Sequence, residues 1–133
     1  MAEQRRWDVE RILVIHDDLQ SPSTARLILE PAGYSVIIAS SGPAALDAFR
    51  TAKPGLVILD VCLPGGSGRD RCRQIRSESK GVPLLVLSAI GDVAEVVRLL
   101  ELGADGYITK PFIPCEFLAR VRVATRHCQG LTV

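Results

Sequence analysis

The chain has 133 residues, of which 47% are hydrophobic and 23% charged, and its formal net charge is +1. This composition predicts one globular domain with a sizeable core, and the charge gives no general attraction to nucleic acid or membranes. No apolar run approaches the roughly 18 residues of a membrane span, and residues 1–10 lack a signal-peptide core. We therefore expect a cytoplasmic protein without membrane contact or direct nucleic-acid binding.

Short apolar runs alternate along the chain with segments of helical periodicity. Runs of this length, rich in Val, Ile and Leu and without polar alternation, are typical of strands buried on both faces of a parallel sheet. The runs occupy residues 12–15, 36–39, 56–59, 84–87 and 107–108.

The first helical segment has recognisable ends. Ser21 followed by Pro22 is typical of an N-cap with proline at the first helical position, and the helix is expected to end near Gly33. The remaining helices are expected at residues 43–52, 69–77, 92–102 and 115–127.

Two of these helices carry a distinctive face. The helix at residues 92–102 has one apolar side, and Gly103 is its predicted C-cap. The helix at residues 69–77 is rich in arginine, which predicts a basic face in contact with solvent rather than a docking surface. The apolar side consists of Val93, Val96, Val97 and Leu100, and the basic face of Arg69, Arg71, Arg73 and Arg76.

The alternation of strands and helices predicts an α/β fold of five βα units in a three-layer, doubly wound arrangement. We expect residues 10–129 to form the domain, residues 1–9 an N-terminal extension, and residues 130–133 a tail or the start of a linker. The glycine-rich segment at residues 63–68 is expected to be a flexible loop after the third strand.

Polar residues follow four of the predicted strands where each strand ends. Asp17 and Asp18 follow the first, Asp60 the third, Ser88 the fourth and Lys110 the fifth. A single aspartate after a strand is usually a helix cap. In an open parallel sheet, however, ligands bind outside the carboxyl ends of the strands, so these groups together predict one shared site.

This set of side chains is suited to phosphoryl chemistry with a metal ion. Close carboxylates repel one another unless a cation intervenes, and Mg²⁺ prefers oxygen ligands and leaves positions for phosphate oxygens. One carboxylate can then act as nucleophile towards a phosphoryl group. The metal and Lys110 would neutralise the phosphoryl oxygens, and Ser88 would donate a hydrogen bond to one of them.

The chain resembles the receiver domains of two-component response regulators. The resemblance is carried by the segments "ILVIHDDLQ", "LVILDVCLPGGSG", "PLLVLSA" and "GADGYITKPF", in that order. It implies a flavodoxin-like (βα)5 fold with strand order 2-1-3-4-5. It also implies a signalling switch that catalyses only its own phosphorylation and dephosphorylation, not an enzyme.

The resemblance assigns the phosphoacceptor and the metal ligands. Asp60 would receive the phosphoryl group from a phosphohistidine on a sensor histidine kinase. The side chains of Asp17 and Asp60 and the backbone carbonyl of Cys62 would bind Mg²⁺, and Asp18 matches a further acidic position beside them.

The resemblance also implies a conformational switch. Ser88 and Lys110 would contact the phosphoryl group, and the rotamer of Tyr107 would follow Ser88 when phosphate binds. A half-buried aromatic on an edge strand is an equally simple description of Tyr107, and the two are compatible.

His16 departs from the family pattern. The pair of acids that usually forms the metal site falls on His16 and Asp17, so a histidine replaces the first acid. One hypothesis is that His16 lowers the affinity for Mg²⁺ or makes it depend on pH, because a protonated imidazole would repel the ion. The other is that His16 lies at the rim of the site without a role.

The last third of the chain resembles the receivers of winged-helix transcription factors, which implies control of transcription by an attached or partner DNA-binding domain. Those receivers often dimerise through their last two helices and last strand with ion pairs. Asp105, Glu116 and Arg120 match that pattern, whereas Val96 and Gly106 replace charged residues that are usual there. Exposed ion pairs contribute about 0.2–1 kcal/mol each. The loss of two of these charges therefore weakens the expectation of such a homodimer without removing it.

Two other functions are compatible with the fold. A pseudo-receiver would bind partners without phosphate, but the retention of Asp60, Ser88 and Lys110 weighs against it. An enzyme on a related fold is the second. A flavodoxin-like carrier needs a glycine- and hydroxyl-rich loop after the first strand, and an aspartate-nucleophile phosphatase needs a second aspartate where Cys62 stands.

Overall fold

One sheet of five parallel strands forms the centre of the protein. The strands are β1 (Asp8–His16), β2 (Ser35–Ala39), β3 (Pro54–Asp60), β4 (Leu84–Ala89) and β5 (Gly106–Lys110). Their order is β2-β1-β3-β4-β5, as the resemblance implies. The computed structural model describes residues 8–16, 22–40, 42–60, 67–89 and 93–130.

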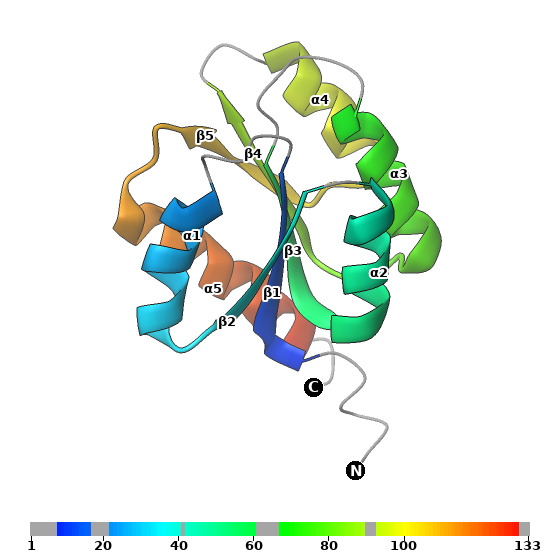
Figure 1. Ribbon diagram of the computed structural model, residues 1–133. Coiled ribbons are helices and arrows are strands. Elements are labelled where there is room, and N and C mark those ends of the chain that lie inside the picture. The colour runs from blue at the N-terminus through cyan, green and yellow to red at the C-terminus, as the bar shows by residue number, and fades with distance from the viewer. Residues whose placement is uncertain (1–7, 17–21, 41, 61–66, 90–92, 131–133) are drawn as a thin grey trace.

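Helices cover both faces of this sheet. They are α1 (Pro22–Leu29) with the 3₁₀ turn η2 (Glu30–Ala32), α2 (Gly42–Ala52), α3 (Ser67–Glu78), α4 (Val93–Glu101) and α5 (Pro114–Gly130). α1 and α5 lie on one face, and α2, α3 and α4 lie on the other (Figure 1). The predicted three-layer α/β fold is confirmed. Within the described ranges, no helix is both long enough and apolar enough to span a membrane.

Alternate residues of the central strands pack into two apolar layers. Leu13 and Ile15 of β1 belong to the layer formed with α2, α3 and α4, whereas Ile12 and Val14 belong to the layer formed with α1 and α5. β3 is buried along its whole length. The strands extend beyond the predicted apolar runs, because the polar residues at their ends also take part in strand pairing.

The parallel strands give the sheet two distinct edges, which we call the amino edge and the carboxyl edge. The strands begin at the amino edge, and this is also where α5 ends at Gly130 (Figure 1). The carboxyl edge carries the last residues of β1, β3 and β5, which are His16, Asp60 and Lys110. The predicted gathering of polar residues at one edge therefore follows directly from the parallel topology.

Two predicted helix ends are confirmed by their backbone conformation. Gly33 has φ 103° after η2, and Gly103 has φ 122° after α4. Positive φ values of this kind are easily adopted only by glycine, which explains why the helices end there. The predicted N-cap Ser21 lies outside the described residues.

The predicted apolar side of α4 is mostly wrong. Of its four residues only Val96 is buried, and Val93 is 68% exposed. The buried side instead consists of Glu95, Val96 and Leu99. Hydrophobic periodicity failed here because a charged residue, Glu95, occupies the inward side of the helix.

Candidate functional site

Asp60 and Lys110 are in direct contact at the carboxyl edge. Asp60 ends β3 with only 3% of its surface exposed, and Lys110 ends β5, two strands away. The Lys110 Nζ donates a hydrogen bond to Asp60 Oδ1 at 2.5 Å. A carboxylate this deeply buried needs a charged or hydrogen-bonded partner, and the long lysine side chain reaches across β4 to provide one.

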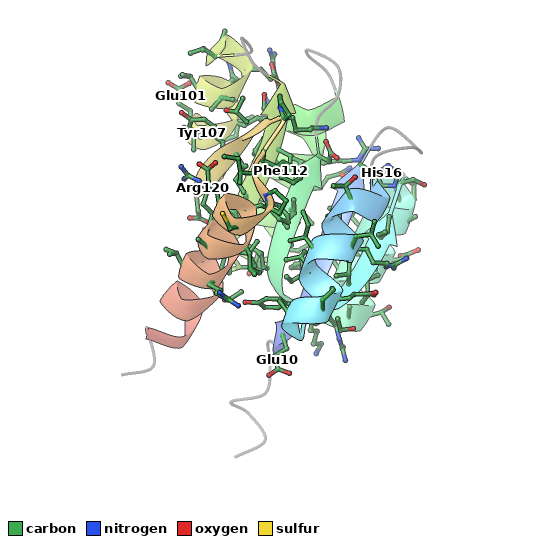
Figure 2. All side chains as sticks on the ribbon, turned by 90° about the vertical axis from the view of Figure 1, so that its left-hand side faces the viewer. Glu10, His16, Glu101, Tyr107, Phe112 and Arg120 are labelled. Carbon is green, nitrogen blue, oxygen red and sulfur yellow. The ribbon has the colours of Figure 1, made fainter. Side chains whose placement is uncertain are left out.

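His16 lies beside Asp60 on the neighbouring strand. The two residues are register partners in the β1–β3 pair. Register partners point to the same face, and the residues two before them, Val14 and Ile58, face α1 and α5. Figure 2 shows His16 at the carboxyl-edge end of β1, with Glu10 at the other end.

The burial of His16 rules out a position at an exposed rim. Its side chain is 2% exposed. Its Nδ1 atom is buried and has no hydrogen-bond partner among the residues that the structure describes. Buried ring nitrogens normally have a partner, so this orphaned atom calls for a physical explanation.

Ser88 and Tyr107 occupy the opposite face of the sheet from Asp60. Ser88 is buried near the end of β4, and Tyr107 on β5 pairs in register with Val86 of β4. Val86 belongs to the layer with α3 and α4, so strand alternation places Ser88 and Tyr107 on that face as well. The half-exposed Tyr107 ring and the Ser88 hydroxyl therefore share the α4 side of the sheet.

Two of the described residues carry donor atoms that a divalent cation could use. Asp60 has carboxylate oxygens, the ligands that Mg²⁺ prefers, and His16 has a buried ring nitrogen at the position where an acid is expected. No group of three or more His, Cys, Asp or Glu side chains gathers within the described part of the chain. The predicted ligands Asp17, Asp18 and Cys62 lie outside it.

An ion pair between α3 and α4 was missed by sequence reasoning. Arg69 donates from Nη2 to Glu95 Oε1 at 2.9 Å and from Nε to Glu95 Oε2 at 3.3 Å. The hydrogen bond to Glu95 raises the pKa of Arg69, and Glu95 is 4% exposed. The sequence did contain a signal for this ion pair. Glu95 lies one residue before Val96 and four before Leu99, so it is on the same side of the helix as these two buried residues.

Arg76 is a second exception to the predicted basic face. Only 15% of its side chain is exposed, and its guanidinium spans the amino edge between α3 and β5. It donates to the backbone carbonyls of Gly103, Val82 and Ser79 at 2.9, 2.8 and 3.1 Å. It also pairs with Asp105 Oδ2 at 2.9 Å. The arginines of α3 are thus partly structural, and the prediction of a purely solvated face is wrong.

The residues predicted for a dimer face have partners within the chain. Asp105 Oδ2 binds Arg76 and accepts a second hydrogen bond, from the Leu84 amide, at 2.8 Å. Glu116 and Arg120 form a pair along α5 at 3.4 Å. Figure 2 shows Arg120 and Tyr107 on the side of the molecule where α4 presents Glu101.

A family model described as "Response regulator receiver domain" matches residues 12–122. The DNA-binding response regulator MtrA of Mycolicibacterium paratuberculosis is 44% identical over 117 residues, which are 88% of this chain and 52% of that protein. MtrA of Mycobacterium tuberculosis H37Rv shows the same identity, with 51% of its length covered. The chain therefore spans about half the length of these curated relatives.

Solved structures give the same result. A response regulator receiver domain protein from Clostridium thermocellum has a TM-score of 0.81 and 27% identity, with 91% of this chain and 98% of that chain covered. The chemotaxis protein CheY4 of Vibrio cholerae has a TM-score of 0.77 and 27% identity, with 86% and 97% covered.

Proposed function

The chain belongs to the response regulator receiver domain family, and from this membership we propose that it is a phosphorylation-dependent switch with Asp60 as phosphoacceptor. The contact between Asp60 and Lys110 is the observation that carries the proposal. It supplies a buried carboxylate nucleophile together with a cation for the incoming charge, which phosphoryl transfer requires.

The phosphoryl donor in this proposal is a phosphohistidine on a sensor histidine kinase. An Asp60 carboxylate oxygen attacks phosphorus, the P–N bond to the donor imidazole breaks, and the imidazole keeps the electron pair. Lys110 neutralises charge on the transferred phosphoryl oxygens, and the Ser88 hydroxyl donates to one of them. Asp60, Asp17 and the Cys62 carbonyl would hold the divalent cation, which when bound would neutralise further phosphoryl charge.

Phosphorylation would then shift a pre-existing equilibrium on the α4 side of the sheet. Ser88 moves towards the phosphoryl group, and the Tyr107 ring follows into the space beside it. The shared face of Ser88 and Tyr107 supports this coupling, because both residues lie on the side of the sheet that α4 covers.

The phosphoacceptor is tested with acetyl phosphate and with beryllofluoride, a phosphoryl analogue, in the presence of Mg²⁺ or Mn²⁺. We expect wild type to incorporate radiolabelled phosphoryl group and to show amide chemical-shift changes around Asp60 and Ser88. Asp60→Asn should abolish both responses. Asp47→Asn makes the same chemical change at an exposed site on α2 and should abolish neither. A silent wild-type protein would overturn the proposal and favour a phosphate-independent pseudo-receiver.

Output through a second copy and a DNA-binding domain is the further part of this proposal. Val93 and Val97 on α4 and Tyr107 on β5 are exposed apolar side chains, and α5 carries the exposed Glu116–Arg120 pair. A homodimer through α4, β5 and α5 would cover these side chains. The similarity to DNA-binding response regulators supports a role in the control of transcription. In this proposal the protein is cytoplasmic, and its receiver domain spans residues 10–129. We expect sedimentation to show a larger fraction of dimers with beryllofluoride than without it.

A further inference from the structure

We propose that His16 is a nitrogen ligand for the divalent cation, and that it shifts the preference of this site from Mg²⁺ towards Mn²⁺. The inference rests on the proposed function, because that function brings a cation to Asp60. It is carried by one juxtaposition: a buried imidazole nitrogen without a protein partner, beside the phosphoacceptor carboxylate.

The first step is the position of the ring. His16 and Asp60 are register partners on adjacent strands, and such partners lie about 4.8 Å apart with side chains on the same face. A cation bound by Asp60 on that face is therefore within the reach of an imidazole. His16 is also the last residue of β1, so the strand pairing holds its backbone in place.

The second step is the orphaned nitrogen. The Nδ1 atom is buried and has no hydrogen-bond partner among the described residues. A neutral imidazole carries one proton and one lone pair, and the lone pair is a good metal ligand. A bound cation would satisfy Nδ1 in a position where the protein itself does not.

The third step is the charge around the site. The Asp60 carboxylate is already paired with the Lys110 ammonium, and an imidazole, which brings no negative charge, replaces the acid expected at position 16. Mg²⁺ is held mainly by negative oxygen ligands, so this exchange weakens its binding. Mn²⁺ accepts imidazole nitrogen as well as carboxylate and phosphate oxygens, so it loses less.

The ligand itself can be observed directly on wild type. Mn²⁺ bound to the protein is examined by electron spin echo envelope modulation, which detects ¹⁴N coupled to the metal. We expect imidazole ¹⁴N modulation in wild type and none in His16→Gln. Asp60→Asn should release the bound Mn²⁺, which places the ion at the proposed site.

The preference is measured by competition of Mg²⁺ against Mn²⁺ at one fixed pH. We expect His16→Asp to lower the ratio of Mn²⁺ to Mg²⁺ affinity by about tenfold, chiefly by improving Mg²⁺ binding. An unchanged ratio, or bound Mn²⁺ without ¹⁴N modulation in wild type, would overturn the inference. Because the spectroscopic result comes from wild type, it holds even where a variant folds poorly.

The two proposals fail in different ways. A beryllofluoride response without ¹⁴N modulation would leave the phosphorylation switch intact and remove only the role of His16. Mn²⁺ bound with ¹⁴N modulation but no beryllofluoride response with either ion would remove the switch while keeping the metal site.

Discussion

The two ends of α3 each carry an arginine that reaches across to a neighbouring element, but the two arginines bind different acceptors. Arg76, at the amino edge, donates to three backbone carbonyls and to Asp105. Arg69, near the carboxyl edge, binds a single side chain, Glu95. Backbone carbonyls cannot move without moving the chain, whereas two side chains can separate and leave the backbone bonds intact.

This difference indicates a fixed amino edge and an adjustable carboxyl edge, with α4 between them. The end of α4 is held by Gly103, whose carbonyl binds Arg76. Its beginning is held by the Arg69–Glu95 pair, while Val93 is exposed. We therefore expect α4 to move at its beginning and to stay in place at its end, which is the motion that the proposed switch at Asp60 would use.

The largest effect is expected at the amino edge. Arg76→Ala removes the Arg76 donor from three backbone carbonyls and one of two hydrogen bonds from Asp105 Oδ2, and should lower the free energy of unfolding by about 3 kcal/mol. Arg73→Ala removes an arginine of the same helix that is 60% exposed, and should change it by less than about 0.5 kcal/mol. Urea unfolding measures both. Equal effects would contradict the special role of Arg76.

A smaller effect is expected from the glycine that accommodates Arg76. A Cβ at Gly103 would lie 2.9 Å from the Arg76 Cγ and Nε atoms, whereas a Cβ at Gly33 meets nothing within 4 Å. Both have positive φ, so Gly33→Ala should cost about 1 kcal/mol and Gly103→Ala about 2 kcal/mol. In an Arg76→Ala background the two costs should become equal. A persistent difference would show that the arginine is not its cause.

Opening the carboxyl edge should have a local rather than a global effect. Glu95→Gln removes the charge that binds Arg69, so we expect faster amide hydrogen exchange at the beginning of α4 and unchanged protection of the Leu84 amide. The loss of stability should be below that of Arg76→Ala. Glu101→Gln makes the same change on the exposed side of α4 and should alter neither. Uniform acceleration across the sheet would argue against a separately adjustable edge.

The smallest effect is expected where α2 and α3 meet at the surface. Arg50 donates to both carboxylate oxygens of Glu78, at 3.1 and 2.7 Å, and this hydrogen bonding lowers the pKa of Glu78 from 4.5. The stabilisation is therefore present above the unfolded-state pKa and is lost as the pH falls through the folded-state pKa.

Glu78→Gln should accordingly be slightly less stable than wild type at about pH 7 and equally stable at about pH 3. High salt should reduce the difference, since both side chains contact solvent. Unfolding curves at the two pH values test this. A difference that grows at low pH would have the wrong sign for this pair.

The sequence was sufficient for features that depend on near neighbours along the chain. Apolar runs revealed the strands, and Gly33 and Gly103 revealed two helix ends. Parallel topology then brought Asp60 and Lys110 to one edge, although they are 50 residues apart. Each of these predictions needed only local patterns and one general rule about parallel sheets.

Pairings between surface-looking charges could not be predicted in the same way. Arg69 and Arg76 looked like members of one solvated face, because their acidic partners, Glu95 and Asp105, lie 26 and 29 residues away along the chain. The inward side of α4 was misjudged for the same reason, since Glu95 is acceptable there only with Arg69 beside it. Such contacts depend on how two helices are rotated against each other, which hydrophobic periodicity does not determine when the buried stripe is charged.

The end of α5 at the amino edge has a consequence for how such a domain is combined with others. A module joined after Gly130 would be attached at the amino edge, whereas Asp60 ends β3 at the carboxyl edge. A different module could then be joined at this end by gene fusion without disturbing the contact between Asp60 and Lys110 at the other end. Under the proposed function, a conformational change at Asp60 would therefore have to be relayed from the carboxyl edge to the amino edge to reach an attached domain.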